Sequence, residues 1–278
     1  MQLCCPVCNL PLHLNDKRLS CDNHHSFDRA RQGYWNLLLA NKKRSKDPGD
    51  NAEMIAARTA FLDTGHYQPI AERVANGLSD YLTADGITQA DIADIGCGEG
   101  YYTQHIHNTL IAQGLNPNTL GLDISKHAVK AACKRSKAIK WTVASGSQVP
   151  VTPHSLDAIS LMFCRLMPEA MHHALKPNGL LLVAWPNAQH LIELRERIYQ
   201  EVRTSSYNPT ALLSERFDLA AQETLNFKIH LTNATAISAL LTMTPHSQRM
   251  PAGERDALAQ CEDLKLTVDV NLGWYRAK

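Results

Sequence analysis

A chain of 278 residues, with 44% hydrophobic and 20% charged residues, can bury a core and has the composition of an ordinary globular protein. Its formal net charge of +1 gives no overall attraction to a polyanion, so only local clusters of charge can indicate such a partner. No apolar run approaches the ~18 residues of a membrane span, and the N-terminus lacks the apolar stretch of a secretory leader. We therefore expect a cytoplasmic protein without membrane contact.

Cysteines cluster at the start of the chain. Twelve residues separate the pair Cys5-x2-Cys8 from the pair Cys21-x3-His25. Three thiolates and one imidazole make a closed four-ligand set of the kind that binds structural zinc as a tetrahedron. A module this small has too little core to fold alone, so bound zinc would stabilise its fold. We predict a structural zinc site formed by Cys5, Cys8, Cys21 and His25.

Two neighbouring residues leave the ligand set open. Cys4 stands beside Cys5, and His24 stands beside His25. We prefer Cys5 because its two-residue spacing to Cys8 forms a compact knuckle. The plain alternative is that these cysteines are unliganded core or surface residues.

The chain divides into three zones. Residues 1–36 are rich in Cys, His and Asn and predict a loop-rich zinc-binding module. Residues 37–52 join a basic run to the turn-forming Asp47-Pro48-Gly49-Asp50, which predicts a flexible basic linker. Residues 53–278 carry a regular pattern and predict one large domain. The basic residues of the linker are Lys42, Lys43, Arg44 and Lys46.

In chain order, the large domain opens with two helices and then alternates strands and helices. Helices are predicted at 53–62, 68–82, 101–112, 125–136 and 190–203, and strands at 92–95, 119–124, 139–144, 157–163, 179–185 and 264–270. This alternation predicts a doubly wound α/β sheet with helices on both faces. The last strand alternates apolar and polar residues, which favours an antiparallel edge strand. A reversed last strand is common in methyltransferases, so we predict a seven-stranded class I methyltransferase fold.

A glycine-rich loop follows the first predicted strand of the sheet. It reads Asp94-Ile-Gly96-Cys-Gly98-Glu-Gly100, which differs from the G-x-G-x-x-G spacing of dinucleotide sites. S-adenosylmethionine has no phosphate, and glycines let the backbone approach its methionine and ribose parts closely. Asp94 can hold the methionine ammonium, directly or through water, and Asp123 can accept both ribose hydroxyls. The alternatives are a site for another nucleotide and a purely structural turn.

The sequence also resembles the bacterial 23S ribosomal RNA guanine-N1 methyltransferases of the RlmA type. Besides the zinc set, the resemblance rests on blocks that run through most of the chain. They are Gly33-Tyr34-x-Asn36-Leu37-Leu38, Lys43 to Met54 around Asp47-Pro48-Gly49-Asp50, Arg58-x-Ala60-Phe61-Leu62-Asp63-x-Gly65-His66-Tyr67-Gln68-Pro69, Asp94 to Thr103, and His190-Leu191-x-Glu193-Leu194. The zinc set joined to the Asp-Pro-Gly-Asp block is far more specific than the glycine loop alone.

The resemblance implies cofactor contacts from Tyr67, Gly98, Glu99 and His190. On the sequence alone, Tyr67 could simply cap a helix and His190 could be a structural histidine. The predicted cofactor site therefore consists of Tyr67, Asp94, Gly96, Gly98, Glu99, Asp123 and His190.

The chain departs from the family in two regions that could border the pocket of the target base. Phe163-Cys164-Arg165 stands where the family has Tyr-Ala-Pro, and the Trp expected after Met243-Thr244-Pro245-His246 is replaced around Ser247–Arg249. These departures concern base recognition and leave the predicted cofactor site unchanged.

The function implied by the resemblance is methyl transfer from S-adenosylmethionine to N1 of a guanine in a hairpin loop of 23S ribosomal RNA. The base must be unpaired or flipped out, because N1 lies on its pairing edge. No general base can be assigned, and Glu99, Asp157, His190 and Glu193 are candidates by residue type only. The family also implies a homodimer.

Two basic series could contact RNA, although solvated faces often carry such runs. The first is the linker run, which would make residues 1–36 an RNA-recognition module. The second lies on or just past one helix and consists of Lys126, Lys130, Lys134, Arg135, Lys137 and Lys140. The competing functions are a zinc-stabilised RNA-binding protein without activity, and a methyltransferase for another RNA position or a small molecule.

Overall fold

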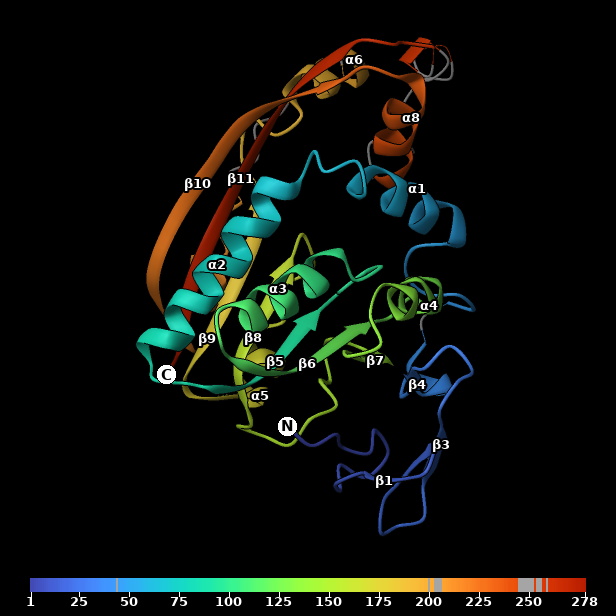
Figure 1. The fold of residues 1–278 in the computed structure, drawn as a ribbon, viewed down its shortest axis with the longest axis vertical. Helices are drawn as coiled ribbons and strands as arrows, with labels where there is room; N and C mark the ends of the chain where they lie inside the picture. Colours follow the sequence, from blue (N-terminus) through green and yellow to red (C-terminus); the bar gives the residue numbers. More distant parts are fainter. Residues whose placement is uncertain (44, 200, 203–206, 245–252, 254–256, 259) are drawn as a thin grey trace.

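A computed structural model describes residues 1–278 except 44, 200, 203–206, 245–252, 254–256 and 259. A mixed sheet of eight strands forms its centre, in the order β10-β11-β9-β8-β5-β6-β7-β4 (Figure 1). These strands are β4 (Trp35–Asn36), β5 (Gln89–Ile95), β6 (Asn116–Asp123), β7 (Lys140–Val143), β8 (Leu156–Met162), β9 (Leu175–Pro186), β10 (Phe217–Leu231) and β11 (Leu264–Ala277). The helices are α1 (Ala52–Leu62), α2 (Gln68–Ala84), α3 (Tyr101–Ala112), α4 (Lys126–Arg135), α5 (Pro168–Ala174), α6 (Ile192–Ile198), α7 (Thr210–Leu213) and α8 (Ala234–Met243).

The predicted doubly wound fold is confirmed. Strands β4 to β9 pair in parallel, whereas β11 runs antiparallel to β9 and to β10. Strand β9 shows why both faces are covered, because its central residues form an unbroken apolar run, as expected for a parallel strand buried on both sides. Leu180 and Leu182 pack with residues of α2 and α3, and Leu181 and Val183 pack with residues of α5 on the opposite face.

The sheet differs from the prediction at both edges. Strand β11 is antiparallel, as predicted, but lies between β9 and β10, so the prediction that it forms the edge was wrong. The edge strand β10 was missed because its first half, Asp218 to Gln222, is exposed and shows no apolar alternation. At the other edge, the two-residue strand β4 adds an eighth strand by pairing Trp35 with Thr142. A strand this short has no detectable period.

Residues before β4 form a small antiparallel sheet of β1 (His13–Asn15), β2 (Arg18–Ser20) and β3 (Ser26–Asp28). This module lies beside the central sheet, at the lower right of Figure 1. Leu3 forms a bridge with Val151, and the Cys4 N–H donates to the Pro150 carbonyl at 3.0 Å. The module therefore packs on the large domain and shares part of its core.

The segment between the module and α1 makes specific contacts. Leu37 and Leu38 are buried, and a short 3-10 helix covers Ala40–Lys42. Further on, the Asp50 carbonyl accepts a hydrogen bond from the Ser125 hydroxyl at 2.6 Å, and Asn51 caps α1 by accepting from the Met54 N–H. These contacts attach both ends of the segment to the large domain. The division of the chain into residues 1–36, 37–52 and 53–278 stays a prediction.

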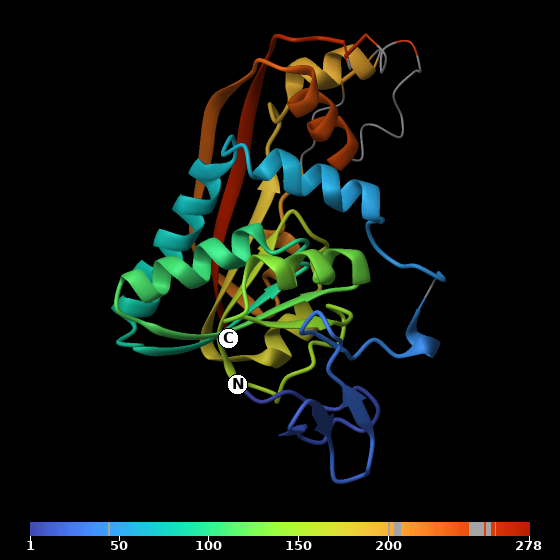
Figure 2. The ribbon, with the colours of Figure 1, turned by 45° about the vertical axis from the view of Figure 1, so that its right-hand side comes forward.

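The far end of the β10–β11 hairpin carries a second group of helices. Helices α1 and α8 contact each other and lie above the carboxyl ends of the parallel strands (Figure 2). Helix α8 was missed, and the predicted helix at 190–203 is shorter than expected, with residues 200 and 203 outside the described part. No helix among the described residues is both long and apolar enough to span a membrane.

Candidate active site and zinc centre

Four side chains of the N-terminal module converge on one point. The ligand atoms of Cys5, Cys8, Cys21 and His25 all lie within 4.8 Å of one another. Cys8 Sγ is 3.6 Å from Cys21 Sγ, and Cys21 Sγ is 3.5 Å from His25 Nδ1. A tetrahedron with Zn–S bonds of about 2.3 Å has edges of about 3.8 Å, so these separations suit zinc.

Two tight turns bring the zinc ligands together. The Asn9 N–H donates to the Cys5 carbonyl at 2.8 Å, and Asn9 has a left-handed backbone with φ of 59°. The Cys21 N–H donates to the His25 carbonyl at 3.1 Å, and His24 takes a φ of 61°. Asn and His tolerate this region better than most residues. The turns point Cys5 and His25 at the cluster and leave their neighbours Cys4 and His24 outside it.

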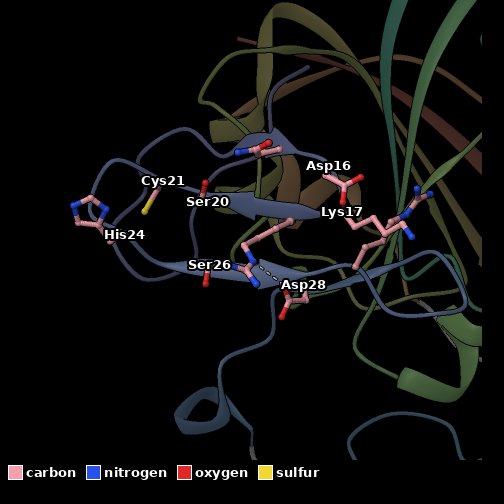
Figure 3. Close-up of a pocket in the computed structure, with 10 residues that line it drawn as sticks. Asp16, Lys17, Ser20, Cys21, His24, Ser26 and Asp28 are labelled. Atoms are coloured by element: carbon pink, nitrogen blue, oxygen red, sulfur yellow. Dashed lines mark hydrogen bonds and ion pairs between the residues drawn. The ribbon is translucent and has the colours of Figure 1, made fainter.

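Beside this cluster, one face of the module is hollowed. The hollow extends over β2 and β3, with Cys21 and His24 at one end and Asp16 and Lys17 at the other (Figure 3). Arg18 and Arg29 also line it, and Arg18 Nε donates to Asp28 at 2.8 Å. The hollow is polar and carries both signs of charge.

The glycine loop joins β5 to α3 at the carboxyl edge of the sheet. The Gly96 N–H donates to the Leu122 carbonyl at 2.8 Å, and the Gly98 N–H donates to Asp123 Oδ2 at 3.0 Å. Gly96, Gly98 and Gly100 all have positive φ, a conformation that favours glycine. A Cβ at Gly96 would collide with the Cys164 sulfur, whereas a Cβ at Gly98 would meet only Arg58, at 3.6 Å. The loop therefore leaves space above Gly98.

Asp94 lies beneath the loop and is 1% exposed. Its carboxylate accepts hydrogen bonds from the hydroxyls of Thr103 and Ser160, the latter at 2.8 Å. Burial raises the pKa of Asp94 to about 6, and these two hydrogen bonds limit the rise. A carboxylate with both oxygens directed by neighbouring hydroxyls can bind one cation in a fixed position.

Asp123 ends β6 next to the loop. Its two oxygens accept the N–H groups of Gly98 and Ser125, at 3.0 and 2.7 Å. Burial raises the pKa of Asp123, and the two hydrogen bonds oppose that rise. Each oxygen retains acceptor capacity, so the carboxylate can accept two adjacent hydroxyls.

Glu99 points away from the space above the loop. It is 1% exposed and forms an ion pair with Arg135, whose Nη2 lies 3.2 Å from Glu99 Oε1. Arg135 also bonds Asp63 at 2.8 Å, and the Tyr101 N–H donates to Glu99 at 2.8 Å. These contacts connect the loop to α1, α3 and α4.

Tyr67 and His190 lie 123 residues apart in the sequence but come together in space. The Tyr67 hydroxyl is 3.5 Å from His190 Nε2, and the Asp269 N–H donates to His190 Nδ1 at 3.2 Å. The Phe163 ring lies almost parallel to the His190 ring, with 6.3 Å between their centroids. The centroid of the Tyr102 ring is 6.2 Å from that of Phe163. Four aromatic rings thus border the end of β8.

Two family models match the chain. One, described as RlmA, N-terminal, covers residues 3–46, and the other, described as Methyltransferase domain, covers residues 92–179. A Streptomyces fradiae protein named 23S rRNA (guanine(748)-N(1))-methyltransferase is 32% identical over 87% of this chain and 84% of its own. A Micromonospora griseorubida relative, provisionally named a 23S rRNA (guanine-N(1)-)-methyltransferase, is 31% identical over 98% of this chain and 96% of its own. The chain belongs to this family.

As a member of the 23S rRNA (guanine-N1)-methyltransferase family, the protein is an S-adenosylmethionine-dependent enzyme with a structural zinc centre. The residues present fit both groups. The zinc set offers four converging ligand atoms, and the loop offers a buried acid, a second acid at the next strand and a glycine without a side chain above it. The four predicted zinc ligands converge on one point, and the predicted cofactor residues Asp94, Gly96, Gly98 and Asp123 lie together at one edge.

In this methyltransferase, three candidate bases are engaged elsewhere. Asp157 lies at the amino end of β8, on the opposite edge of the sheet from the loop, and pairs with Lys176 at 2.6 Å. Burial alone would raise the pKa of Glu193, but hydrogen bonds from Lys228 and Thr267 lower it to about 2. Glu99 is held by Arg135.

His190 is the fourth candidate base, and its hydrogen bonds disfavour that role. Because Nδ1 accepts the Asp269 N–H, the neutral ring carries its proton on Nε2. In that tautomer Nε2 is a donor toward the Tyr67 hydroxyl. His190 therefore presents a donor at this position.

Some side chains of the two basic series are exposed to solvent, and others are engaged by neighbouring groups. Lys42, Lys43, Lys46, Lys126 and Lys134 are exposed, while Arg135 is engaged by Glu99 and Asp63. Arg44 lies outside the described residues, as do Pro245, His246 and the segment around Ser247–Arg249. Lys137 and Lys140 are exposed but donate to neighbouring oxygen atoms.

Sequence reasoning assigned no role to Arg58 and Tyr102, although both stand in the blocks that carry the family resemblance. Arg58 borders the open side of Gly98, and the Tyr102 hydroxyl is buried without a hydrogen-bond partner among the described residues. The signal for Arg58 could have been a charged residue within an otherwise apolar helical stretch, whereas the polar stretch around Tyr102 offers no such signal.

We predict that Cys8→Ser releases zinc and destabilises the module, because removing one thiolate opens the closed four-ligand site. The measurement is zinc content per chain by atomic absorption, together with a thermal melt. Cys4→Ser is the matched control, since Cys4 lies next to the ligands but outside the cluster, and should retain its zinc. A full zinc content in Cys8→Ser would rule out this ligand set.

Proposed function

We propose that the enzyme transfers the methyl group of S-adenosylmethionine to N1 of a guanine in a hairpin loop of 23S ribosomal RNA, in the cytoplasm. The observation that carries this proposal is the family's zinc module joined to a methyltransferase domain in a chain that covers 84% and 96% of two relatives with that named activity. The named substrates of those relatives support the assignment of RNA, and the family implies a homodimer.

We assign the cofactor site to the carboxyl edge of β5 and β6. Asp94 would hold the methionine ammonium, Asp123 the ribose hydroxyls, and Gly96 and Gly98 would allow close approach of the backbone. Tyr67 and His190 would border the methionine end, and Glu99 would keep the loop in position through Arg135. The bound cofactor supplies an activated methyl group, so the main task of the protein is alignment.

The acceptor base is best accommodated next to Phe163. A hollow lies at the carboxyl ends of β8 and β9, lined by Phe163, Cys164, Arg165, Leu166, Pro168, Val183, Ala184, Trp185, Pro186, Tyr207 and Leu212. Cys164 contacts Gly96, so the hollow adjoins the cofactor loop. Phe163 is 39% exposed and has a φ of 53°, which is an unusual conformation for an aromatic residue and is most often found at functional sites. A flipped-out base would stack on this ring.

The proton on guanine N1 must leave as the methyl group arrives. Negative charge then develops on the neighbouring O6, and a correctly placed donor stabilises it. Glu99, Asp157 and Glu193 are engaged elsewhere, and His190 presents no acceptor at this corner. We therefore infer that the N1 proton passes to water and that hydrogen-bond donors near O6 contribute more than a dedicated base. RNA would be held by the exposed lysines of both basic series and by the polar hollow of the zinc module.

The direct experiment is methyl transfer from labelled S-adenosylmethionine to unmodified 23S ribosomal RNA, followed by mapping with reverse transcriptase. We expect one label per RNA and a stop at one hairpin guanine, because N1 methylation blocks the pairing edge. Label on a small metabolite with none on RNA, or a stop at another base, would overturn the substrate assignment. Cofactor binding without any transfer would leave an RNA-binding protein.

Substitution Asp94→Asn should separate stability from cofactor binding. The pKa of Asp94 is raised from 3.8 to about 6 by burial, so the folded state binds an extra proton between these values and stability falls as pH rises through this window. The variant cannot ionise at this position. Above pH 6 its free energy of unfolding should exceed that of the unmodified enzyme by about 1 to 3 kcal/mol, and near pH 4 it should have no such advantage. Urea titrations at pH 4 and pH 7.5 measure this.

The same variant should lose most of its affinity for S-adenosylmethionine at pH 7.5. In the unmodified enzyme, affinity should fall as pH drops below about 6, because the protonated acid no longer attracts the ammonium. Calorimetric titrations over this pH range give both curves. An Asp94→Asn enzyme that binds the cofactor normally would exclude the proposed ammonium contact.

Phe163→Leu should reduce kcat/KM for RNA by roughly 10- to 100-fold, since stacking of a base on an aromatic ring contributes about 1–3 kcal/mol. Phe163→Tyr should retain most of the activity, and the Kd of S-adenosylmethionine should be unchanged in both variants. Ile111→Ala truncates another exposed hydrophobic residue, at the far end of α3, and serves as the control. Equal activity of the Leu and Tyr variants would argue against stacking.

A further inference from the structure

The amino-acid end of S-adenosylmethionine carries two opposite charges, and the residues assigned so far bind only one of them. Asp94 suits the ammonium, and Asp123 suits the ribose. Tyr67, Gly96, Gly98, Glu99 and His190 carry no permanent positive charge. A carboxylate brought next to the buried acid Asp94 would be repelled unless a cation offsets the charge, and the charge of Glu99 is already balanced by Arg135. The site therefore needs a cationic residue that neither the sequence motifs nor the family resemblance assigned.

Arg58 lies where this cation is needed. It stands on α1, and its Nη1 is 3.6 Å from the position of a Cβ on Gly98, the glycine with open space above it. Its side chain is 27% exposed. Burial raises the pKa of Glu99 and of Asp123, and the charge of Arg58 opposes both shifts, which is consistent with a position near the loop that joins these acids. The guanidinium thus borders the loop from the side of α1.

Arg58 is held in place but retains binding capacity. Its Nη1 pairs with Asp50 at 2.5 Å, and Asp50 is the one acid within ion-pair distance of Arg58 among the described residues. Asp50 is itself fixed, because its carbonyl accepts the Ser125 hydroxyl and the following residue caps α1. A guanidinium has five N–H donors in a planar fork, so a pair through one nitrogen leaves donors for a second carboxylate.

The other arginines near the loop are less suitable. Arg135 is engaged by Glu99 and Asp63 and packs on the Tyr101 ring. Arg165 is exposed and lines the hollow next to Phe163, on the side proposed for the RNA base. Arg58 is the arginine that combines a fixed position with proximity to Gly98.

Tyr102 gives an independent indication of a ligand atom that accepts a hydrogen bond. Its hydroxyl is buried and has no hydrogen-bond partner among the described residues, although buried hydroxyls nearly always have one. Tyr102 lies on the first turn of α3, directly after the loop. Burial raises the pKa of its hydroxyl, and the charge of Arg58 opposes that rise. The Tyr102 hydroxyl therefore lacks an acceptor among the described residues, and an oxygen atom of a ligand would supply one.

We propose that Arg58, positioned by Asp50, binds the α-carboxylate of S-adenosylmethionine, with the Tyr102 hydroxyl as a second donor. This assignment depends on the cofactor and not on the identity of the RNA, so it stands or falls separately from the proposed substrate. The Asp-Pro-Gly-Asp segment thereby acquires a role in the cofactor site, because it holds the arginine that faces the loop.

The test compares two cofactors that differ only in the carboxylate. Calorimetry measures the Kd of S-adenosylmethionine and of decarboxylated S-adenosylmethionine for the full chain with its zinc. The unmodified enzyme should prefer the carboxylated form by roughly 10- to 100-fold, the range expected for a charged hydrogen-bonded pair. Arg58→Gln should lose this preference and bind the decarboxylated form as the unmodified enzyme does.

Four further variants make the outcome decisive. Arg58→Lys retains the charge and should restore part of the preference, and Tyr102→Phe should lower it by a smaller factor. Arg73→Gln removes an ion-paired arginine on α2, bonded to Glu223, and should leave both Kd values unchanged. No preference in the unmodified enzyme, an equal loss for both cofactors in Arg58→Gln, or loss of the preference in Arg165→Gln would each overturn the proposal.

Discussion

The site depends on the parallel pairing of β5 with β6. This pairing places the carboxyl ends of the two strands side by side, so that the loop after one strand meets the acid that ends the other. The hydrogen bond from the Gly98 N–H to Asp123 joins them, and glycines make the required left-handed turns possible. The neighbouring pairing of β5 with β8 places Ser160 against Asp94 in the same way. The buried Asp94 and the partly buried Asp123 thus reach one edge with their oxygens already oriented.

The N-terminal quarter of the chain extends from the zinc centre to the cofactor loop. The zinc module contacts the large domain through Leu3 and Cys4, β4 adds to the sheet beside β7, and the Asp-Pro-Gly-Asp segment contacts the first turn of α4. Helix α1 then positions Arg58 beside Gly98. Loss of the zinc would disturb a segment whose backbone leads on to α1 and Arg58, which gives the module a structural consequence apart from the proposed contact with RNA.

The buried ionisable groups near the loop differ in how they are compensated. Glu99 is neutralised by Arg135, whereas Asp94 receives hydrogen bonds from hydroxyls only and has its pKa raised to about 6 by burial. An uncompensated buried acid costs folding free energy, and such a cost is common at binding sites. The contrast distinguishes Glu99, which fixes the loop, from Asp94, the acid that we propose binds the cofactor ammonium.

The sequence by itself was enough to predict the four residues that converge as a candidate zinc set, the glycine loop and the type of fold. These features are local, because ligand spacing, loop glycines and strand periods are all contained in short segments, and the predicted strands from 92–95 to 179–185 all appear in the structure. Only the tertiary structure decided that β10 takes the edge beyond β11, that Phe163 faces His190, and that Arg58 reaches Gly98. A sequence period shows which face of an element is apolar, but not which distant element covers it. Contacts between residues separated by tens of positions depend on how the whole chain packs.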